Sequence, residues 1–525
     1  MIAVSYLLEK CAYMQCVFKM MPRRAEEIKM RFTRRGFIKA TSASVFLPAI
    51  VGRAWAAEGG TPLPIPDVMD LAGGTMGELT AQLGSSQMVQ GRMTETAGYS
   101  QSYLGPVIRV QRGETARLTL GNSIAEPISV HWHGMHIEGA QDGGPHTPVL
   151  PDATRDAALD IDQPAATLWY HSHIMERTGA HVWYGLAGML LVDDPAAADS
   201  GLPSTYGEDD IPLVVQDRIF GRNGELVYSP RGPSLMHGYR GEEILVNGAI
   251  RPEASVPSGM VRLRILNGSN ARIYHLHFED GRSFAQVGTD GGLLPEAASM
   301  NVLTLAPAER AEIVVDFSDG AAVRLLSGED TNAMMGGMMG GGGGMGGMMG
   351  GSSPATNTNG AFEVMRFAVN TQAMAKVTAA PGVLAGAPVP DFGEPVRRRA
   401  FRLEMAGGMM RMMSGGGGMR INGASMDMGV INEQCAVGET EIWEITADEM
   451  QHPFHVHGTS FQVIRQNGVP VDAAKVGLKD VVLVNGKTEI LVRFDRMADA
   501  AAPYMYHCHI LEHEDAGMMG QFTVA

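Results

Sequence analysis

Ten of the 16 histidines in this 525-residue sequence fall into four short clusters. The clusters are two pairs and two triplets: His131/His133, His171/His173, His452/His455/His457 and His507/His509/His513. Residues i and i+2 of a β-strand point to the same face, so each His-x-His pair would present two imidazoles together. Imidazole suits copper, zinc, iron and nickel, and eight imidazoles from four pairs are enough to hold a cluster of several metal ions.

The segment His507-Cys508-His509 predicts a second kind of metal centre. If both imidazoles face one way on a strand, the thiol of Cys508 faces the other way and is available to a separate ion. Further ligands for that ion are at hand in His452, His513 and Met518. Two imidazoles, a thiolate and a weak axial Met form a blue-copper electron-transfer site. The counterpart of Cys508 in the first part of the chain is Ser172, which cannot build this site.

Short alternating segments dominate the sequence that must position these ligands. Polar residues alternate with Ala116, Leu118 and Leu120, and again with Val261, Leu263 and Ile265. This period of two, with Gly, Pro and Asn between the runs, predicts antiparallel strands, and no long stretch has a helical period. We therefore expect an all-β protein built of sandwiches or Greek-key barrels.

An internal repeat divides the chain into three units. The segment Gly113-Glu-Thr-Ala-Arg-Leu-Thr-Leu recurs loosely from Gly259 and again from Gly438, at offsets of about one domain each. The first and last units also share the His pairs, which the middle unit lacks. We predict domains at 60–196, 205–375 and 395–525, with a linker rich in Ala, Pro and Gly at 379–396.

Composition and the amino end indicate the compartment. The net charge of −16 argues against a nucleic-acid binder, and four Cys are too few for a disulfide scaffold. The segment Thr33-Arg34-Arg35-Gly36-Phe37, an apolar stretch and Ala54-Trp55-Ala56 predict a twin-arginine signal within residues 1–56. We expect export to the periplasm by the twin-arginine translocase and a mature chain without a membrane span. Met1 and Met30 both remain possible starts, and the state of Cys435 stays open.

The spacing His-Cys-His-x3-His-x3-Gly-Met from His507 to Met518, with the other clusters in order, resembles the multicopper oxidase family. The resemblance covers essentially the whole mature chain. It implies three cupredoxin-like Greek-key β-sandwich domains and four copper ions, one of type 1, one of type 2 and two of type 3. It implies that the type 1 copper is bound by His452, Cys508, His513 and Met518. It also implies a type 2 copper on His131 and His455, and two type 3 coppers on His133/His171/His509 and His173/His457/His507.

The resemblance also implies a reaction. Electrons enter one at a time at the type 1 copper, pass through Cys508 and its flanking His residues, and reduce O2 to water at the cluster of three coppers. Asp142 and Glu514 match the acidic residues that lie near the cluster in the family, and a carboxylate can relay protons to reduced oxygen. We expect the protein to act as a monomer.

Two Met-rich segments indicate the electron donor. The segment from Met334 to Met349 holds 7 Met and 9 Gly, between Leu325 and Phe362, and the segment from Met405 to Met428 holds 8 Met. Thioether sulfur prefers Cu(I) to hard cations. The first segment, which cannot form a core, is predicted to be a solvated loop inserted between two strands. A plain linker with Met as gap filler is the alternative, but a linker gains nothing from exposed Met, so we favour copper capture.

The second Met-rich segment resembles the cover of the type 1 site in periplasmic cuprous oxidases. That resemblance implies that Asp448 and Met450 bind substrate Cu(I), with further candidates in Met409, Met410, Met412 and Met413. The larger insertion departs from those enzymes, because it falls in the middle unit. We expect oxidation of Cu(I) to Cu(II) coupled to reduction of O2, for copper tolerance. The alternatives are a laccase-like oxidase of phenols or aromatic amines, and a non-catalytic copper-sequestering or scaffold protein.

Overall fold

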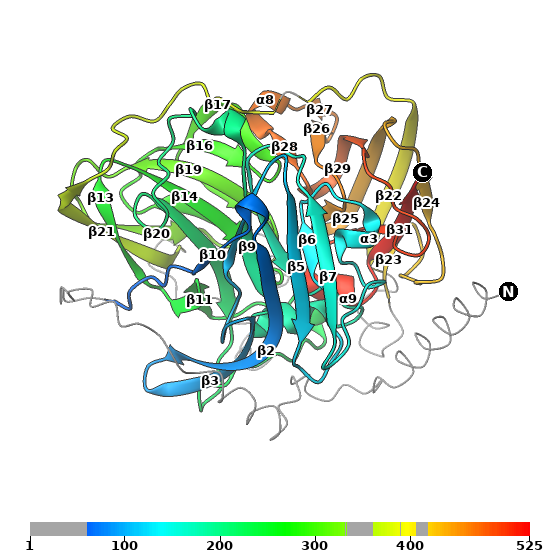
Figure 1. The fold of residues 1–525 in the computed structure, drawn as a ribbon, viewed down its shortest axis with the longest axis horizontal. Helices are drawn as coiled ribbons and strands as arrows, with labels where there is room; N and C mark the ends of the chain where they lie inside the picture. Colours follow the sequence, from blue (N-terminus) through cyan, green and yellow to red (C-terminus); the bar gives the residue numbers. More distant parts are fainter. Residues whose placement is uncertain (1–59, 331, 333–360, 389, 406–417) are drawn as a thin grey trace, which may run out of the picture.

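The structure, a computed structural model, describes residues 60–330, 332, 361–388, 390–405 and 418–525 (Figure 1). The predicted signal segment, the insertion 334–349 and Met409–Met413 lie outside the described residues. Strands form most of the described chain, and its α-helices are short. These are α3 (Gly139–Asp142), α4 (Thr178–Tyr184), α5 (Pro233–His237), α8 (Ala473–Val476) and α9 (Leu511–Asp515). None of the helices described is long and apolar enough to cross a membrane.

The first unit consists of two sheets around one apolar core. One sheet has the order β1 (Val68–Asp70), β4 (Val107–Gln111), β9 (Ala187–Asp193), β8 (Ala166–His171) and β6 (His131–His133). The other has the order β3 (Arg92–Tyr99), β2 (Met76–Val89), β5 (Thr115–Asn122) and β7 (Thr154–Asp160). Buried residues of both sheets, such as Leu118 and Leu168, pack together because the alternating pattern turns one face of each sheet inward.

The second unit is a larger sandwich of the same kind. Its first sheet has the order β12 (Ala249–Ile250), β11 (Glu243–Val246), β10 (Asp210–Arg218), β14 (Met260–Asn267), β19 (Arg310–Asp316), β16 (Phe284–Thr289) and β17 (Gly292–Met300). Its second sheet has the order β13 (Glu253–Ser258), β21 (Phe362–Met374), β20 (Val323–Ser327), β15 (Tyr274–Phe278) and β18 (Leu303–Leu305). Strands β20 and β21 are antiparallel partners, with Ser327 opposite Phe362, so the Met/Gly-rich insertion joins two neighbouring strands as expected.

The strands of the third unit are joined into one continuous sheet. Its main path has the order β24 (Glu433–Cys435), β31 (Met519–Val524), β30 (Tyr504–Cys508), β25 (Thr440–Val456), β29 (Val481–Arg493), β26 (Phe461–Gln466) and β27 (Val469–Pro470). The remaining strands are β22 (Arg397–Met405), β23 (Met419–Ile421) and β28 (Leu478–Lys479). Strand β25 is long enough to pair with β22 at its start and with β30 at its end. Its register against β29 shifts between Ala447 and His452, so residues 448–451 form a bulge.

The predicted repeat corresponds to the same strand in each unit. Gly113, Gly259 and Gly438 precede β5, β14 and β25, and all three have positive φ, of 88°, 122° and 76°. Glycine adopts this left-handed conformation without the steric cost that a Cβ brings. Each of these strands also has a parallel partner, β2, β10 or β22. The expectation of antiparallel strands is therefore incomplete. In the first two units the chain crosses to the other sheet between the two parallel strands, through β4 or β13, and then returns.

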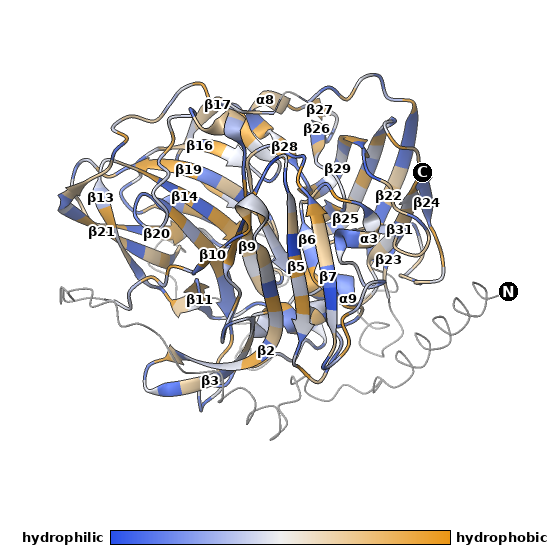
Figure 2. Cartoon of the chain, viewed as in Figure 1, coloured by the Kyte–Doolittle hydropathy of each residue, from blue (hydrophilic) through white to orange (hydrophobic). Residues whose placement is uncertain are grey.

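The three units adjoin one another: in Figure 1 the blue and cyan strands of the first lie beside the green strands of the second, and α8 of the third lies next to β17 of the second. Each unit has its own buried apolar cluster. A further cluster joins units one and two, where Trp169 and Met189 pack with Leu245. Apolar residues are concentrated on inner strands such as β9 and β10 (Figure 2). The predicted all-β class is confirmed.

Candidate metal centres

Eight imidazoles from the first and third units meet in one buried cluster. Strands β6 and β8 place His131 opposite His171, and strands β25 and β30 place His455 opposite His507 in the same register. The remaining four imidazoles belong to His133, His173, His457 and His509. All eight side chains are at most 1% exposed. The repeated pairing explains why the His pairs recur in the sequence, since each unit contributes one half of the cluster.

The ring nitrogens of the two units approach one another closely. The Nε2 atoms of His131 and His455 are 3.4 Å apart, and the Nε2 atom of His507 lies 3.3 Å from that of His173 and 3.2 Å from that of His457. The rings of His133 and His455 are stacked, with centroids 3.7 Å apart. These nitrogens are close enough for groups of three imidazoles to share one ion, among them His173, His457 and His507.

In most of these rings, one of the two nitrogens contacts a carbonyl or carboxylate oxygen of the protein. The carbonyl oxygen of Asp142 lies 2.9 Å from Nδ1 of His131, and that of Asp480 lies 2.8 Å from Nδ1 of His455. A carboxylate oxygen of Asp142 lies 2.8 Å from Nδ1 of His457. Acceptors of this kind fix the neutral tautomer and leave the other nitrogen's lone pair available to a metal.

Several inward nitrogens have no hydrogen-bond partner within the described structure. They are Nδ1 of His133, Nε2 of His171 and both ring nitrogens of His509. Burying a polar atom without a partner costs about 1–3 kcal/mol, so such atoms call for a ligand. These three rings surround Trp169, whose ring centroid lies 5.1 Å, 4.2 Å and 5.6 Å from theirs. The unpartnered nitrogens therefore fit metal ions bound inside the cluster.

A second centre is built around Cys508. Its Sγ lies 3.4 Å from Nδ1 of His452 and 3.6 Å from Nδ1 of His513, and the two Nδ1 atoms are 3.3 Å apart. Helix α9 returns the chain toward β30 and so places His513 beside the thiol. Gly517, at a φ of 100°, then lets the chain turn, and the buried Met518 accepts a hydrogen bond from the amide of Cys508 through its carbonyl oxygen. The structure thus brings together all four residues predicted for this centre.

Burial controls the protonation of this second centre. It lowers the pKa of His452 to about 4, so the imidazole is neutral and able to act as a ligand at neutral pH. It raises the pKa of the Cys508 thiol, which therefore becomes a thiolate only when a cation compensates the charge. These donors therefore suit a metal ion better than the role of a free nucleophile.

Both predicted proton carriers contact the imidazole cluster. Asp142 is the last residue of α3. The next residue, Gly143, has a φ of 83°, and a Cβ there would lie 1.7 Å from the carbonyl oxygen of Val130, so glycine is needed at this turn. Glu514 lies on α9, 3.2 Å from Nδ1 of His507. Burial alone would raise the pKa of Glu514, but the imidazoles of His173 and His507 outweigh burial and lower the pKa well below its usual value.

Sequence reasoning missed a buried ion pair beside the cluster. Asp480 and Arg310 are both fully buried, and their two contacts measure 2.7 Å and 2.5 Å. The same carboxylate lies 3.1 Å from Nε2 of His133, so it holds the outer nitrogen of that ring. Arg310 comes from the second unit, which has no His pair. One sequence signal for this pair was available: Lys479 and Asp480 directly precede the apolar run at 481–484. Charged side chains beside a buried strand need buried partners.

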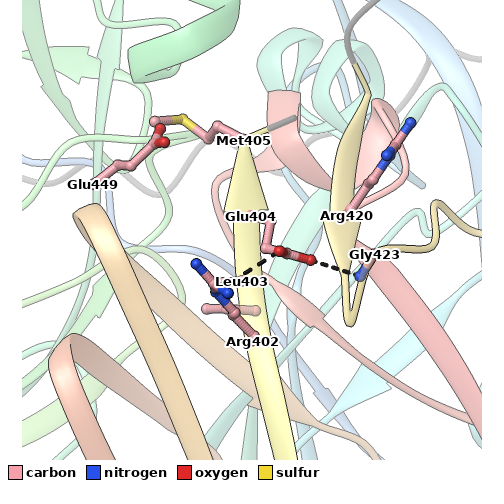
Figure 3. Close-up of a pocket in the computed structure, with 7 residues that line it drawn as sticks. All are labelled: Arg402, Leu403, Glu404, Met405, Arg420, Gly423 and Glu449. Carbon is pink, nitrogen blue, oxygen red and sulfur yellow. Dashed lines mark hydrogen bonds and ion pairs between the residues drawn. The ribbon is translucent and has the colours of Figure 1, made fainter. Parts of the chain in front are cut away.

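The predicted substrate residues lie at the bulge of β25. Met450 is 5% exposed and packs with the core around Cys508, whereas the side chain of Asp448 lies outside the described structure. The second Met-rich segment leaves β22 after Met405 and returns at Met419, its opposite partner on β23. The Met405 side chain extends toward Glu449 of the bulge across a cavity of 160 Å³ (Figure 3).

Comparison with known proteins identifies the family. Residues 81–197 and 397–525 each match a profile described as multicopper oxidase. A protein of Sodalis glossinidius (strain morsitans), named cell division protein FtsP, is 35% identical over 94% of this chain and 99% of its own length. The chain belongs to the multicopper oxidase family.

Solved structures of multicopper oxidases share the fold. A bacterial laccase-like multi-copper oxidase, CueO from Ochrobactrum sp., is 39% identical, with a TM-score of 0.80 over 88% of this chain and 100% of its own. A multi-copper oxidase from Pediococcus acidilactici is 35% identical, with a TM-score of 0.75 over 89% of this chain and 92% of its own. The three units are therefore cupredoxin-like domains. The buried His clusters are consistent with the copper sites of multicopper oxidases.

Proposed function

We propose that this protein is a copper oxidase that oxidises Cu(I) to Cu(II) and reduces O2 to water. The reaction balances as four Cu(I), one O2 and four protons giving four Cu(II) and two waters. The observation that carries the proposal is the intact donor set: ten imidazoles and one thiol converge in two buried centres, and nitrogens of His133, His171 and His509 lack a hydrogen-bond partner. When bound, copper would supply one-electron transfer at the Cys508 centre and O2 reduction at the imidazole cluster.

The chain's own residues suit the assignment that the family resemblance implies. His452, Cys508, His513 and Met518 would hold the type 1 copper, and His131 and His455 the type 2 copper. His133, His171 and His509 would hold one type 3 copper, and His173, His457 and His507 the other. The contact of His131 with His455 and the grouping of the last three imidazoles support this division.

Electron and proton paths follow from the chain's geometry. Cys508 belongs to the type 1 centre while its neighbours His507 and His509 belong to the imidazole cluster, so the connection between the two centres is covalent. Asp142 and Glu514 would carry protons, since each carboxylate contacts an imidazole of the cluster. Both acids are buried, in a part of the protein that bulk water does not supply with protons directly, so a carboxylate relay would be needed there.

The position of the Met-rich segments supports Cu(I) as the donor. Met405, where the second segment begins, extends toward Glu449 of the bulge (Figure 3). Asn332, at the start of the Met/Gly-rich insertion, exchanges hydrogen bonds with the backbone of Gln451, directly before His452. Both segments thus begin beside the type 1 ligands, although they belong to different units. Soft sulfur at that place favours Cu(I) over bulky organic donors.

Two alternatives have their own support. The Ochrobactrum protein is described as having oxidase activity towards lignin model compounds, which favours a laccase-like oxidase of phenols. The name of the Sodalis relative favours a role in cell division, for which a scaffold without turnover would suffice. We also propose export by the twin-arginine pathway to the periplasm. Replacing Arg34 and Arg35 by Lys should keep the protein in the cytoplasm, and unchanged fractionation would contradict this route.

The function is tested by O2 consumption on addition of Cu(I). Wild-type protein should bind four copper ions, turn blue and consume O2, whereas Cys508→Ser should lose the blue colour and nearly all turnover. Cys435→Ser is the matched control, because that buried thiol lies beside Glu441 and away from the His clusters. A colourless wild type that takes up no O2 after full copper loading would refute the oxidase and favour the scaffold.

The donor is tested by deleting residues 405–419. We expect the deletion to reduce Cu(I) turnover and to increase turnover of a phenol, because the Met-rich cover is lost from the type 1 site. Unchanged Cu(I) turnover after the deletion would refute the proposal that this segment binds Cu(I) as the electron donor. An increase with the phenol alone would identify the protein as laccase-like.

A further inference from the structure

The second unit contacts the type 1 centre from outside, at the imidazole of His513 and at the residue before His452. Nε2 of His513 lies 2.8 Å from the carbonyl oxygen of Met236, in α5. On the other side, Nδ2 of Asn332 donates to the carbonyl oxygen of Gln451 at 2.9 Å, and the amide of Gln451 donates to Oδ1 of Asn332 at 3.2 Å. Gln451 directly precedes His452. The type 1 centre therefore has one contact from unit two beside each of its imidazoles.

A buried ion pair connects these two contacts. Nε of Arg240 lies 2.6 Å from a carboxylate oxygen of Asp330, and the two side chains are 7% and 0% exposed. The same guanidinium donates to the carbonyl oxygens of His237 and Gly238, at the end of α5. It also reaches the carbonyl oxygen of Ala271 at 3.2 Å. Arg240 thus fixes the end of the helix whose carbonyl holds His513.

The carboxylate of Asp330 continues the network toward His452. It accepts hydrogen bonds from the amides of Ile273 at 3.1 Å and Asn332 at 2.9 Å. The chain of contacts therefore runs from His513 through Met236, Arg240, Asp330 and Asn332 to Gln451. Every side chain that carries it is nearly or fully buried, so water does not compete with these bonds.

We propose that Arg240, Asp330 and Asn332, here called the unit-two clamp, position the type 1 ligands and determine which electron donors reach them. The inference rests on the proposed copper oxidase function. A carbonyl that accepts from the outer nitrogen of a ligand imidazole fixes its tautomer and makes the ring more electron-rich. The clamp holds that carbonyl on His513 and therefore favours Cu(II) in the type 1 centre.

The clamp also explains how donors are selected. His513 and His452 are at most 1% exposed, and α5 covers the outer nitrogen of His513, where a phenol would otherwise make direct contact. A phenol would therefore have to transfer its electron to this centre through α5. A small ion bound at the bulge of β25 would approach from the other side, where Met450 stands two residues before His452. The clamp thus acts as a specificity-determining element built from unit two.

Two variants test the clamp in the full copper-loaded chain. Arg240→Lys keeps the charge beside Asp330 but loses the fork that binds several carbonyls at once. Asn332→Ala removes the two bonds to Gln451. Arg324→Lys is the matched control, because Arg324 forms a forked pair with Glu279 on the exposed surface of the same unit. The readouts are the blue absorption band, the type 1 redox potential, and kcat/KM for Cu(I) and for 2,6-dimethoxyphenol.

We expect both clamp variants to broaden the blue band and to raise the ratio of kcat/KM for the phenol to that for Cu(I). Arg240→Lys should also raise the type 1 potential, because His513 becomes a poorer donor to Cu(II). The control should match the wild type in all readouts. Clamp variants that lose thermal stability but keep the wild-type band, potential and ratio would show a merely structural role and overturn the inference. A wild type that remains colourless with copper would instead overturn the proposed function.

Discussion

Replacing Asp480 by Asn should weaken copper binding in the imidazole cluster more than it weakens the fold. The carboxylate forms two short contacts with Arg310 and a 3.1 Å contact with Nε2 of His133. Its backbone carbonyl holds His455, and the substitution does not change that contact. Asn preserves the shape and one acceptor oxygen but removes the charge. The perturbation therefore acts on the ring of His133 and on one buried ion pair, and more weakly on His455, whose Nδ1 lies 3.8 Å from the same carboxylate.

The structure sets the size of both effects. Removing one partner of a buried ion pair costs about 3–5 kcal/mol. Arg310 keeps Asp290 at 3.6 Å and several carbonyl acceptors, so we expect the lower end, about 3 kcal/mol. For a unit of this size, that corresponds to a decrease in Tm of roughly 6–12 °C. The loss of a charged acceptor behind a ligand imidazole should weaken copper binding by about 10–100-fold.

The assay is a copper titration of the apoprotein against a chelator, followed by the near-ultraviolet absorption of the type 3 pair. Asp217→Asn is the matched control, because Asp217 is equally buried and pairs with Arg272 at 2.9 Å without contacting an imidazole. It should lose comparable thermal stability but keep its copper affinity. If Asp480→Asn binds copper as tightly as Asp217→Asn does, Asp480 does not position His133 and the reasoning is wrong.

Three further outcomes follow from the same sites. The apoprotein should become less stable toward urea as the pH falls from about 6.5 toward about 4. Burial lowers the pKa of His452 to about 4, so in this pH range the unfolded state binds a proton that the folded state does not. A stability that does not change with pH would contradict this. Cys435→Ser should leave the copper count and blue band unchanged, since burial raises the pKa of that thiol to about 12. Ser172→Cys should create no second blue band, because Ile128 stands where the third unit has His452, and a second band near that of the wild type would disprove the argument.

The fold was largely predictable because its signals are periodic. Alternation at Leu118 and Leu263 indicates strands, and the glycines at 113, 259 and 438 mark the same turn in each unit. The direction of each strand was not predictable, since a parallel and an antiparallel partner leave the same alternating pattern. The parallel partners β2, β10 and β22 depend on how the chain crosses between sheets, and that information is tertiary.

The candidate ligands were predictable for a different reason. A His-x-His pair encodes its own geometry, because strand pleating alone places both rings on one face. The positioning residues carry no such local signal. Arg310 lies 170 residues from Asp480, and Asn332 lies 119 residues from Gln451. Single charged or amide side chains at such separations have no characteristic spacing, so only the fold reveals which of them meet.

The second unit owes its place in the molecule to these long-range contacts. It lost the His pairs of its neighbours, yet Arg310 reaches the imidazole cluster through Asp480, and Met236 and Asn332 reach the type 1 centre. The first and third units supply the ligands, but both of their sites are held from outside by unit two. A pair of ligand-bearing units alone would leave His513 without the acceptor that sets its tautomer, and would leave Asp480, the acceptor of His133, without its partner Arg310. Retention of the middle unit is therefore a requirement of ligand geometry, not only of size or stability.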